Sequence, residues 1–384
     1  MTIVSIEDLR HAARCRLPRA IFEFIDGGAQ DEVTLRANRE DFRRVALLPR
    51  ALTDVSNRSQ SVTVLGQRYD SPLILAPTGL PGVVWPNGAM EAALAADRAG
   101  VGFCLSTMST SSIEEISRAS QRAIWFQLYV MRDRELGKAL MQRAKAAGCS
   151  VLVITVDLQM QGQRDRDVRN GLTIPPQFRF SNAVDFALHP GWVWRFLTGP
   201  KVTLANFAGT GKGDDMFTIA GFVNSQFDQS VTWKDIDWVR SVWDGPLALK
   251  GILHPEDAKL AADHGVNAVI VSNHGGRQLD GVPSAIAALP DVVDAVEGRI
   301  EVIRDGGVRR GNDVLKAMAL GARACMIGRP FLYGLAANGG KGVSKTLELL
   351  RNEIDLNLAL LGRAGVRELD RTALTWAGRV LGEA

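Results

Sequence analysis

The sequence contains few cysteines, no long apolar run and little net charge, and each of these absences excludes a class of protein. The four cysteines in 384 residues are scattered and form no CxxC pair, so we expect neither a disulfide framework nor a metal site. The simplest interpretation is a reducing compartment, in which the thiols act as small buried apolar groups.

No stretch is apolar over the roughly 20 residues that a membrane-spanning helix requires. The N-terminus has no basic segment followed by an apolar core, so a signal peptide is not expected. A formal net charge of +3 is too weak to indicate nucleic-acid binding. We therefore expect a soluble, cytoplasmic protein without a nucleic-acid partner.

What the sequence does contain is the ordinary mixture of a globular protein. Hydrophobic residues make up 46% and charged residues 23%, so the chain can bury a sizeable core without disulfides or metals. Length alone leaves open whether this core belongs to one large domain or to two ordinary ones.

One pattern repeats from Pro72 onward: a short apolar run, a loop with Gly, Ser or Asp, and an alanine-rich helical stretch. The runs lie at 72–77, 102–106, 124–129, 151–156, 246–250, 268–272, 301–305 and 324–328. The helical stretches lie at 89–99, 113–119, 135–147, 255–264 and 311–320. Apolar runs that alternate with helices are typical of a parallel sheet covered on both faces. Eight units favour an α/β fold with a closed (β/α)8 TIM barrel, in one domain over 1–384, rather than an open doubly wound sheet.

Polar residues gather where the apolar runs end. In a barrel these ends converge on one mouth, where catalysis takes place. The residues concerned are Thr78, Ser106, Gln127, Tyr129, Thr155, Asp157, Lys250, His274, Asp305 and Arg329.

Two segments lie outside the repeat. Residues 1–71 are predicted to form a helical preface followed by a capping hairpin around 62–66. Residues 158–245, after the fourth run, are too long for an ordinary loop and predict a lid or an interaction element. Within this insertion Trp192 and Trp194 lie beside Arg195 and Lys201. That pattern indicates, with about equal weight, a membrane-interface contact or a helix packed on the barrel or on a neighbouring subunit.

The most informative segment is Ser272–Asp280, which reads SNHGGRQLD. His274 follows a buried strand and precedes two glycines that let backbone approach a ligand closely. Arg277 could hold a carboxylate while His274 takes a proton, a pairing suited to an acidic substrate. The other histidines, which we interpret as structural, are His11, His189, His254 and His264.

Two glycine-rich turns follow the seventh and eighth runs. They read IRDGGVRR at 303–310 and MIGRP at 326–330. Free backbone N–H groups and arginines at these two places form the usual phosphate site of a barrel. Either turn alone would be weak evidence, but together they predict a phosphate-bearing ligand.

With these motifs in place, the chain resembles the FMN-dependent family that oxidises L-2-hydroxy acids, which includes glycolate oxidase, mandelate dehydrogenase and respiratory L-lactate dehydrogenase. The resemblance extends from Arg16-Leu17-Pro18 to the C-terminal helices, and Ser272–Asp280 is its most specific motif. The bacterial L-lactate dehydrogenases are most similar, through the segments 27–29, 144–150 and 243–246.

The resemblance implies FMN as cofactor and a role for each matching residue. His274 would be the catalytic base and Asp157 would stabilise its protonated form, while Arg164 and Arg277 would clamp the substrate carboxylate. Tyr129 would donate a hydrogen bond to the substrate, and Lys250 would face the flavin edge that becomes negative on reduction. Residues expected against the flavin ring are Pro77, Thr78, Gly79, Ser106, Gln127 and Thr155. Those expected on the ribityl chain and phosphate, or close to them, are Ser272, Asp305, Gly306, Gly307, Arg309, Gly328 and Arg329.

Position 24 departs from the family, which normally has a tyrosine that reaches the substrate carboxylate. Here the residue is Phe24, and losing a hydrogen bond to a charged group costs about 1.5–3 kcal/mol. We expect Phe24 to tune specificity toward a less polar or bulkier acid. Met108, often aromatic in glycolate oxidase-like members, leaves the preferred side chain of the substrate open as well.

Gly79 occupies a position where oxidases of the family tend to have alanine and dehydrogenases glycine. The expected reaction is therefore oxidation of a small L-2-hydroxy acid, such as L-lactate or mandelate, with electrons passed to a quinone or another acceptor. Alternatives are a peroxide-forming oxidase, an FMN barrel with another substrate owing to Phe24, and a barrel kept only as a binding module. Hydride transfer and initial α-proton removal both stay open. The resemblance also implies a homotetramer, and the Trp-rich insertion indicates peripheral contact with the inner face of the cytoplasmic membrane.

Overall fold

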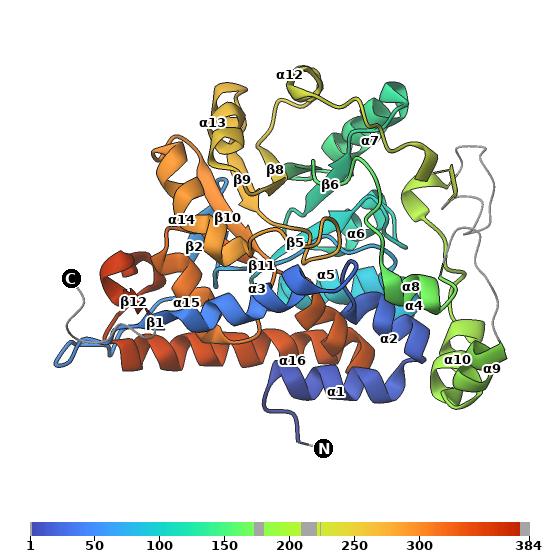
Figure 1. Ribbon diagram of the computed structural model, residues 1–384, viewed down its shortest axis with the longest axis horizontal. Coiled ribbons are helices and arrows are strands. Elements are labelled where there is room, and N and C mark those ends of the chain that lie inside the picture. Colours follow the sequence, from blue (N-terminus) through green and yellow to red (C-terminus); the bar gives the residue numbers. More distant parts are fainter. Residues whose placement is uncertain (1, 173–179, 209–220, 223, 377–384) are drawn as a thin grey trace.

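A closed barrel of eight parallel strands forms the centre of the protein in the computed structural model, which describes residues 2–172, 180–208, 221–222 and 224–376 (Figure 1). The strands follow one another around the barrel in chain order, and the last pairs with the first. They are β4 (Leu73–Leu75), β5 (Gly102–Ser106), β6 (Trp125–Tyr129), β7 (Val151–Thr155), β8 (Leu247–Ile252), β9 (Ala268–Val271), β10 (Glu301–Asp305) and β11 (Ala324–Ile327). The predicted TIM barrel and the eight predicted strands are confirmed.

The strands are mainly apolar because both of their faces are covered. Every residue of β5, β6, β7 and β9 is buried. One face fills the barrel interior and the other lies under the surrounding helices, so no alternating pattern of polar residues is needed.

Helices connect the strands around the outside of the barrel (Figure 1). Local sequence sets where several of them begin: Ser112 and Glu115 form a reciprocal capping box at the start of α6, and the Asp133 carboxylate caps α7. The barrel helices are α4 (Pro81–Val84), α5 (Gly88–Arg98), α6 (Ile113–Ala119), α7 (Arg134–Ala146), α12 (Trp233–Val242), α13 (Pro255–Asp263), α14 (Ala285–Val296), α15 (Gly311–Ala319) and α16 (Arg329–Leu361). The predicted helices agree to within one residue at each end.

The N-terminal preface is helical and ends in a hairpin, as predicted. It comprises α1 (Ile6–Arg16), α2 (Arg19–Asp26), α3 (Val33–Arg44), β1 (Val45–Leu47), β2 (Val62–Val64) and β3 (Gln67–Tyr69). Helix α1 packs along α16, and β1 pairs with the C-terminal strand β12 (Leu374–Trp376), which follows η2 (Val366–Glu368) and η3 (Arg371–Ala373). In this way the preface pairs with the C-terminal end of the described chain beside the barrel (Figure 1).

The predicted long insertion after the fourth strand lies between β7 and β8, and its last helix, α12, packs on α7. Its other described elements are α8 (Asp165–Arg169), α9 (Phe180–Ala187), α10 (Pro190–Thr198) and η1 (Ala205–Phe207). Residues 173–179, 209–220 and 223 of the predicted insertion lie outside the described residues. Within the described part of the chain, no helix combines the length and apolarity needed to cross a bilayer.

Three of the four thiols are buried, namely Cys104, Cys149 and Cys325. The expectation of buried thiols is wrong for Cys15, which is exposed on α1. That helix buries only the face formed by Ile6, Leu9 and Ala13, and Cys15 lies off this face.

Candidate active site

The carboxyl ends of the barrel strands bring the predicted polar residues to one mouth. Tyr129 ends β6, Thr155 ends β7, and Asp305 ends β10. Lys250 lies in β8, and His274 follows β9 by three residues. Because all strands run in the same direction, side chains far apart in sequence meet here.

His274 and Asp157 form the central pair of the site. The Nδ1 atom of His274 lies 2.8 Å from Oδ1 of Asp157, and the backbone N–H of His274 donates to the Ser272 hydroxyl at 3.0 Å. His274 has a left-handed backbone, with φ of 56°. Burial lowers the pKa of His274, and the Asp157 carboxylate opposes that effect without overcoming it.

Room for this pair comes from a break in β8. The register of β8 against β9 shifts between Lys250 and Ile252, and Gly251 in between has φ of 107°. A Cβ atom on Gly251 would lie 2.6 Å from the Cβ of Asp157, so only glycine allows the aspartate to lie beside the strand. The second carboxylate oxygen of Asp157 is buried without a hydrogen-bond partner among the described residues.

Lys250, Asp305 and Ser272 form a buried polar group inside the mouth. The Lys250 ammonium lies 2.9 Å from Asp305 and donates to Ser272 at 3.0 Å, while Ser272 donates to Asp305 at 2.8 Å. Burial alone would lower the pKa of Lys250, but Asp305 and Asp157 outweigh it and raise that pKa. Burial would likewise raise the pKa of Asp305, and Lys250 outweighs it and lowers that pKa. Both groups are therefore held in their charged forms.

Two guanidinium groups, those of Arg164 and Arg277, lie near His274 and in each other's field. Arg277 donates through Nη1 to the backbone carbonyls of Phe24, at 2.7 Å, and Gly27, at 3.0 Å. The Arg164 side chain lies 3.8 Å from Asp167, and its Nε lies 3.4 Å from the Arg277 carbonyl. Burial lowers the pKa of both arginines, and each also lies in the field of nearby charges. Two cations share Asp167, so the arrangement favours an added anion.

Phe24 is half-buried and lies against Arg277, with the guanidinium carbon 5.3 Å from the ring centroid. This is a cation–π contact, in which the ring face stabilises the charge without donating a hydrogen bond. Tyr129 is buried, and its ring meets Phe227 edge-on at 5.4 Å. Burial raises the pKa of Tyr129 to about 12, so its hydroxyl stays a donor.

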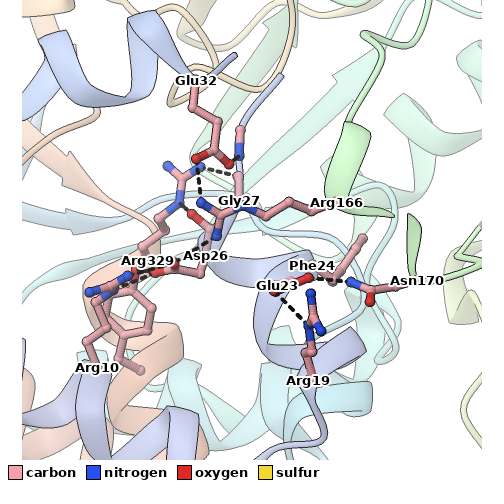
Figure 2. Close-up of polar contacts among 12 residues, drawn as sticks. Arg10, Arg19, Glu23, Phe24, Asp26, Gly27, Glu32, Arg166, Asn170 and Arg329 are labelled. Carbon is pink, nitrogen blue, oxygen red and sulfur yellow. Dashed lines mark hydrogen bonds and ion pairs between the residues drawn. The ribbon is translucent and has the colours of Figure 1, made fainter. Parts of the chain in front are cut away.

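Helix α2 supplies one wall of the site through a charge cluster around Asp26 (Figure 2). The Asp26 carboxylate accepts from Arg10 at 2.7 and 2.9 Å and from the Tyr333 hydroxyl at 2.7 Å. Arg166 lies 3.5 Å from Asp26 and also pairs with Glu32. Sequence reasoning missed Asp26; the pattern that could have found it is an acidic residue ending an apolar helix directly before Gly27.

The predicted phosphate residues lie together beside this wall. Gly306 and Gly307 have φ values of 100° and 73°, and a Cβ on Gly307 would lie 2.0 Å from the Asn38 carbonyl. Among the described residues, the N–H groups of Gly307 and Gly328 donate no hydrogen bond. The Nε of Arg309 is buried without a partner in the same part of the chain.

Arg329 lies in the predicted place but is already engaged. It donates to the backbone carbonyls of Asp26 at 3.2 Å, Gly275 at 2.9 Å and Gly27 at 2.7 Å. Arg329, Asp26 and Gly27 are labelled in Figure 2. The Arg329 guanidinium thereby ties α2 to the loop that carries His274.

The remaining predicted residues line the ends of β4 to β7. Gln127 accepts through Oε1 from Ser106 at 3.3 Å, and its Nε2 is buried without a partner among the described residues. Thr155 is buried, and the turn formed by Pro77, Thr78 and Gly79 is half-buried. The other histidines lie elsewhere; His254, for example, caps α13.

Comparisons with known proteins agree with this geometry. The family model described as "FMN-dependent dehydrogenase" matches residues 13–376. The chain is 46% identical to an L-lactate dehydrogenase of Caulobacter sp. (strain K31), over 99% of this chain and all of the relative. It matches the crystal structure of the monotopic membrane protein (S)-mandelate dehydrogenase with a TM-score of 0.95 at 39% identity, covering 98% of this chain and 100% of that one. A mandelate oxidase structure matches with a TM-score of 0.84 at 40% identity, over 98% of each chain.

Proposed function

Because the chain belongs to the family of FMN-dependent dehydrogenases, we propose that it oxidises an L-2-hydroxy acid to the 2-oxo acid at the mouth around His274. The observation that supports this most directly is the His274–Asp157 pair at 2.8 Å beside the half-buried guanidinium groups of Arg164 and Arg277. A base next to a carboxylate-binding pair fits a substrate that has a hydroxyl and a carboxylate on adjacent carbons.

The residues at the mouth fit FMN, the cofactor on which the family depends. The unpaired N–H groups of Gly307 and Gly328 and the unpaired Nε of Arg309 suit a phosphate. The unpaired Nε2 of Gln127 and the charged Lys250 suit the carbonyl-bearing edge of the ring. When bound, FMN supplies the acceptor for two electrons from the substrate.

The chain's own groups hold the substrate and move the proton. Arg277, fixed by two backbone carbonyls, binds the substrate carboxylate together with Arg164. Tyr129 donates a hydrogen bond to it. His274 takes a proton from the substrate, since its lowered pKa keeps the imidazole neutral at physiological pH. Asp157 then stabilises the imidazolium that results, because an adjacent carboxylate favours the charged form.

Anaerobic mixing with substrate tests the reaction class. Purified protein is mixed with L-lactate, L-mandelate and longer L-2-hydroxy acids while the flavin absorbance is followed. We expect bleaching with the L-acids, none with their D-enantiomers, and none in His274→Ala. A yellow protein that no acid bleaches would overturn the proposal.

The preferred acid is set, in this proposal, by the apolar wall that Phe24 forms against Arg277. A ring without a hydroxyl favours a less polar or bulkier substituent on the substrate. Phe24→Tyr should restore a hydrogen-bond donor and shift the ranking toward small acids such as L-lactate. An unchanged ranking and KM in that variant would contradict this role for Phe24.

The electron acceptor proposed is a quinone at the inner face of the cytoplasmic membrane, reached through the surface of α9 and α10. Leu188, Trp194 and Leu197 are 74%, 70% and 74% exposed, whereas Trp192 is buried, stacked between Phe186 and Phe196 at 5.4 and 4.8 Å. One side of α10 is thus packed and the other free to enter an interface. Gly79, at the position where oxidases of the family tend to have alanine, supports a dehydrogenase rather than an oxidase.

Flotation with vesicles of anionic and neutral lipid tests the membrane contact. Trp194→Ser with Leu197→Ser should abolish flotation, while Leu356→Ser, at a residue on α16 that is 58% exposed, should not. We also propose a homotetramer, which light scattering of the purified protein would check.

A further inference from the structure

Arg304, the second-last residue of β10, has a fully buried charged side chain that makes no hydrogen bond among the described residues. Its side chain has 0% exposure, and among the described residues none of its guanidinium nitrogens, Nε, Nη1 and Nη2, finds an acceptor. The guanidinium group lies over the face of Phe42, with its carbon 4.3 Å from the ring centroid. Leaving a buried charge unpaired is strongly destabilising unless another charge compensates it.

The nearest carboxylates do not fill that role by contact. Asp305 is the next residue, but alternate residues of a strand point to opposite faces, and its carboxylate pairs with Lys250 inside the barrel. Asp313 accepts from the backbone N–H groups of Arg309 and Arg310 instead. Burial therefore dominates and lowers the pKa of Arg304, although a guanidinium stays protonated in proteins.

The Arg304 guanidinium lies directly beneath the glycine turn that follows β10. A Cβ atom on Gly307 would lie 3.2 Å from Nη2 of Arg304. The N–H of Gly307 donates no hydrogen bond within the described chain, and Arg309 two residues later has its unpaired Nε. N–H groups without an acceptor and positively charged side chains thus lie close together around the turn at 306–309.

We propose that Arg304 is a positioning residue for the cofactor: its buried charge, beneath the turn at 306–309, would be compensated by the phosphate dianion that this turn would hold. This rests on the proposed function, which assigns the FMN phosphate to that turn. The attraction between the guanidinium and the phosphate is electrostatic and acts across the turn without direct contact. The low polarity around the buried guanidinium strengthens it. Two consequences follow: Arg304 favours FMN over uncharged riboflavin, and it destabilises the flavin-free protein.

Arg304→Met tests both consequences, because methionine keeps much of the side-chain volume and removes the charge. FMN release from diluted holoprotein is followed by flavin fluorescence, and riboflavin is titrated into flavin-free protein. We expect FMN affinity to fall about tenfold or more, as removal of a nearby charge predicts, with riboflavin affinity unchanged. The flavin-free variant should melt at a higher temperature than flavin-free wild type, since an unpaired buried charge is gone. Arg304→Lys should keep the preference for FMN, and Arg118→Gln, at an exposed residue of α6, should alter neither affinity.

Equal losses of FMN and riboflavin affinity in Arg304→Met would overturn the proposal, because they would mean that Arg304 only shapes the turn. Unchanged affinity for both would overturn it as well. If Arg304→Met does not fold, Arg304→Gln supplies the same comparison of FMN and riboflavin affinity, and equal losses in that variant would likewise contradict the proposal. Arg304→Met could lose FMN affinity selectively while no 2-hydroxy acid bleaches the flavin of the wild-type protein. In that case the role of Arg304 would stand, and only the proposed reaction would be overturned.

Discussion

The Nδ1 atom of His274 lies 2.8 Å from Oδ1 of Asp157, across a gap that exists because Gly251 has no side chain. Each residue follows a different strand, and 117 positions separate them in the sequence. The pair defines which nitrogen of His274 is engaged by protein, and the proposed function assigns the other, Nε2, to the substrate. Most of the chemistry proposed for this site depends on that relationship.

Asp157→Asn should reduce kcat by about 10²–10⁴, the range for losing support to a general base. The amide cannot stabilise the imidazolium, and without the carboxylate the pKa of His274 should fall further below its ordinary value. The acid limb of kcat/KM against pH should therefore move to lower pH in the variant. An acid limb that stays in place, or moves up, would show that Asp157 does not act through His274.

His274 should make the stability of the protein depend on pH. Its pKa in the folded protein is lower than the ordinary 6.5, so the unfolded chain binds more protons as the pH falls through that region. The free energy of unfolding should therefore decline on acidification below about pH 6.5 and be restored above it. His274→Gln should flatten this part of the profile in denaturant titrations, and an identical slope in both proteins would contradict the assignment.

Lys250→Met should lower the free energy of unfolding by about 3–5 kcal/mol, because it leaves the Asp305 carboxylate buried without its cation. Its matched control is the double variant Lys250→Met with Asp305→Asn, which removes both charges. The double variant should be more stable than the single one in urea titration. Equal stability of the two variants would show that Lys250 and Asp305, 2.9 Å apart, do not stabilise each other.

Arg277→Lys should raise KM by about 10- to 100-fold, the effect of losing hydrogen bonds to a charged group. Lysine cannot reach the carbonyls of Phe24 and Gly27 and present a flat donor pair to a carboxylate at the same time. The Kd of the 2-oxo acid product should rise in parallel, whereas the melting temperature of the holoprotein should change little. A fall in kcat with unchanged KM and Kd would place Arg277 outside carboxylate binding.

Asp26→Asn should loosen the wall that α2 forms. Burial would raise the pKa of Asp26, but the hydrogen bonds from Arg10 and Tyr333 lower it to about 2. The carboxylate thus contributes stability that is present above its ordinary pKa of 3.8 and is lost as the pH falls toward 2. We expect the variant to lose about 2 kcal/mol at neutral pH and clearly less near pH 3, as measured by chemical unfolding at both pH values. A loss independent of pH would exclude the ion pairs as its cause.

The sequence by itself determined the barrel and the position of its mouth. Buried parallel strands must be apolar on both faces, so the eight runs stood out and their boundaries came within a few residues of the observed ones. The polar residues that end the runs, such as Lys250 and His274, could then be assigned to one mouth, because parallel strands share a direction. Their individual roles rested on the resemblance and stay predictions.

Only the tertiary structure decided how those residues are held. The Asp26 cluster joins α1, α2, α8 and α16, and the Arg277 side chain is fixed by backbone carbonyls 253 and 250 positions away; no local pattern encodes such contacts. The contact of α12 with α7 also came only from the folded chain, because a helical pattern in the sequence does not say which neighbour the helix packs against. Arg304 was counted only as part of a glycine-rich motif, since a sequence shows that a charge is present but not that it is buried without a partner. Periodicity reports which face of an element is apolar, whereas pairing between distant charges depends on packing that only the folded chain creates.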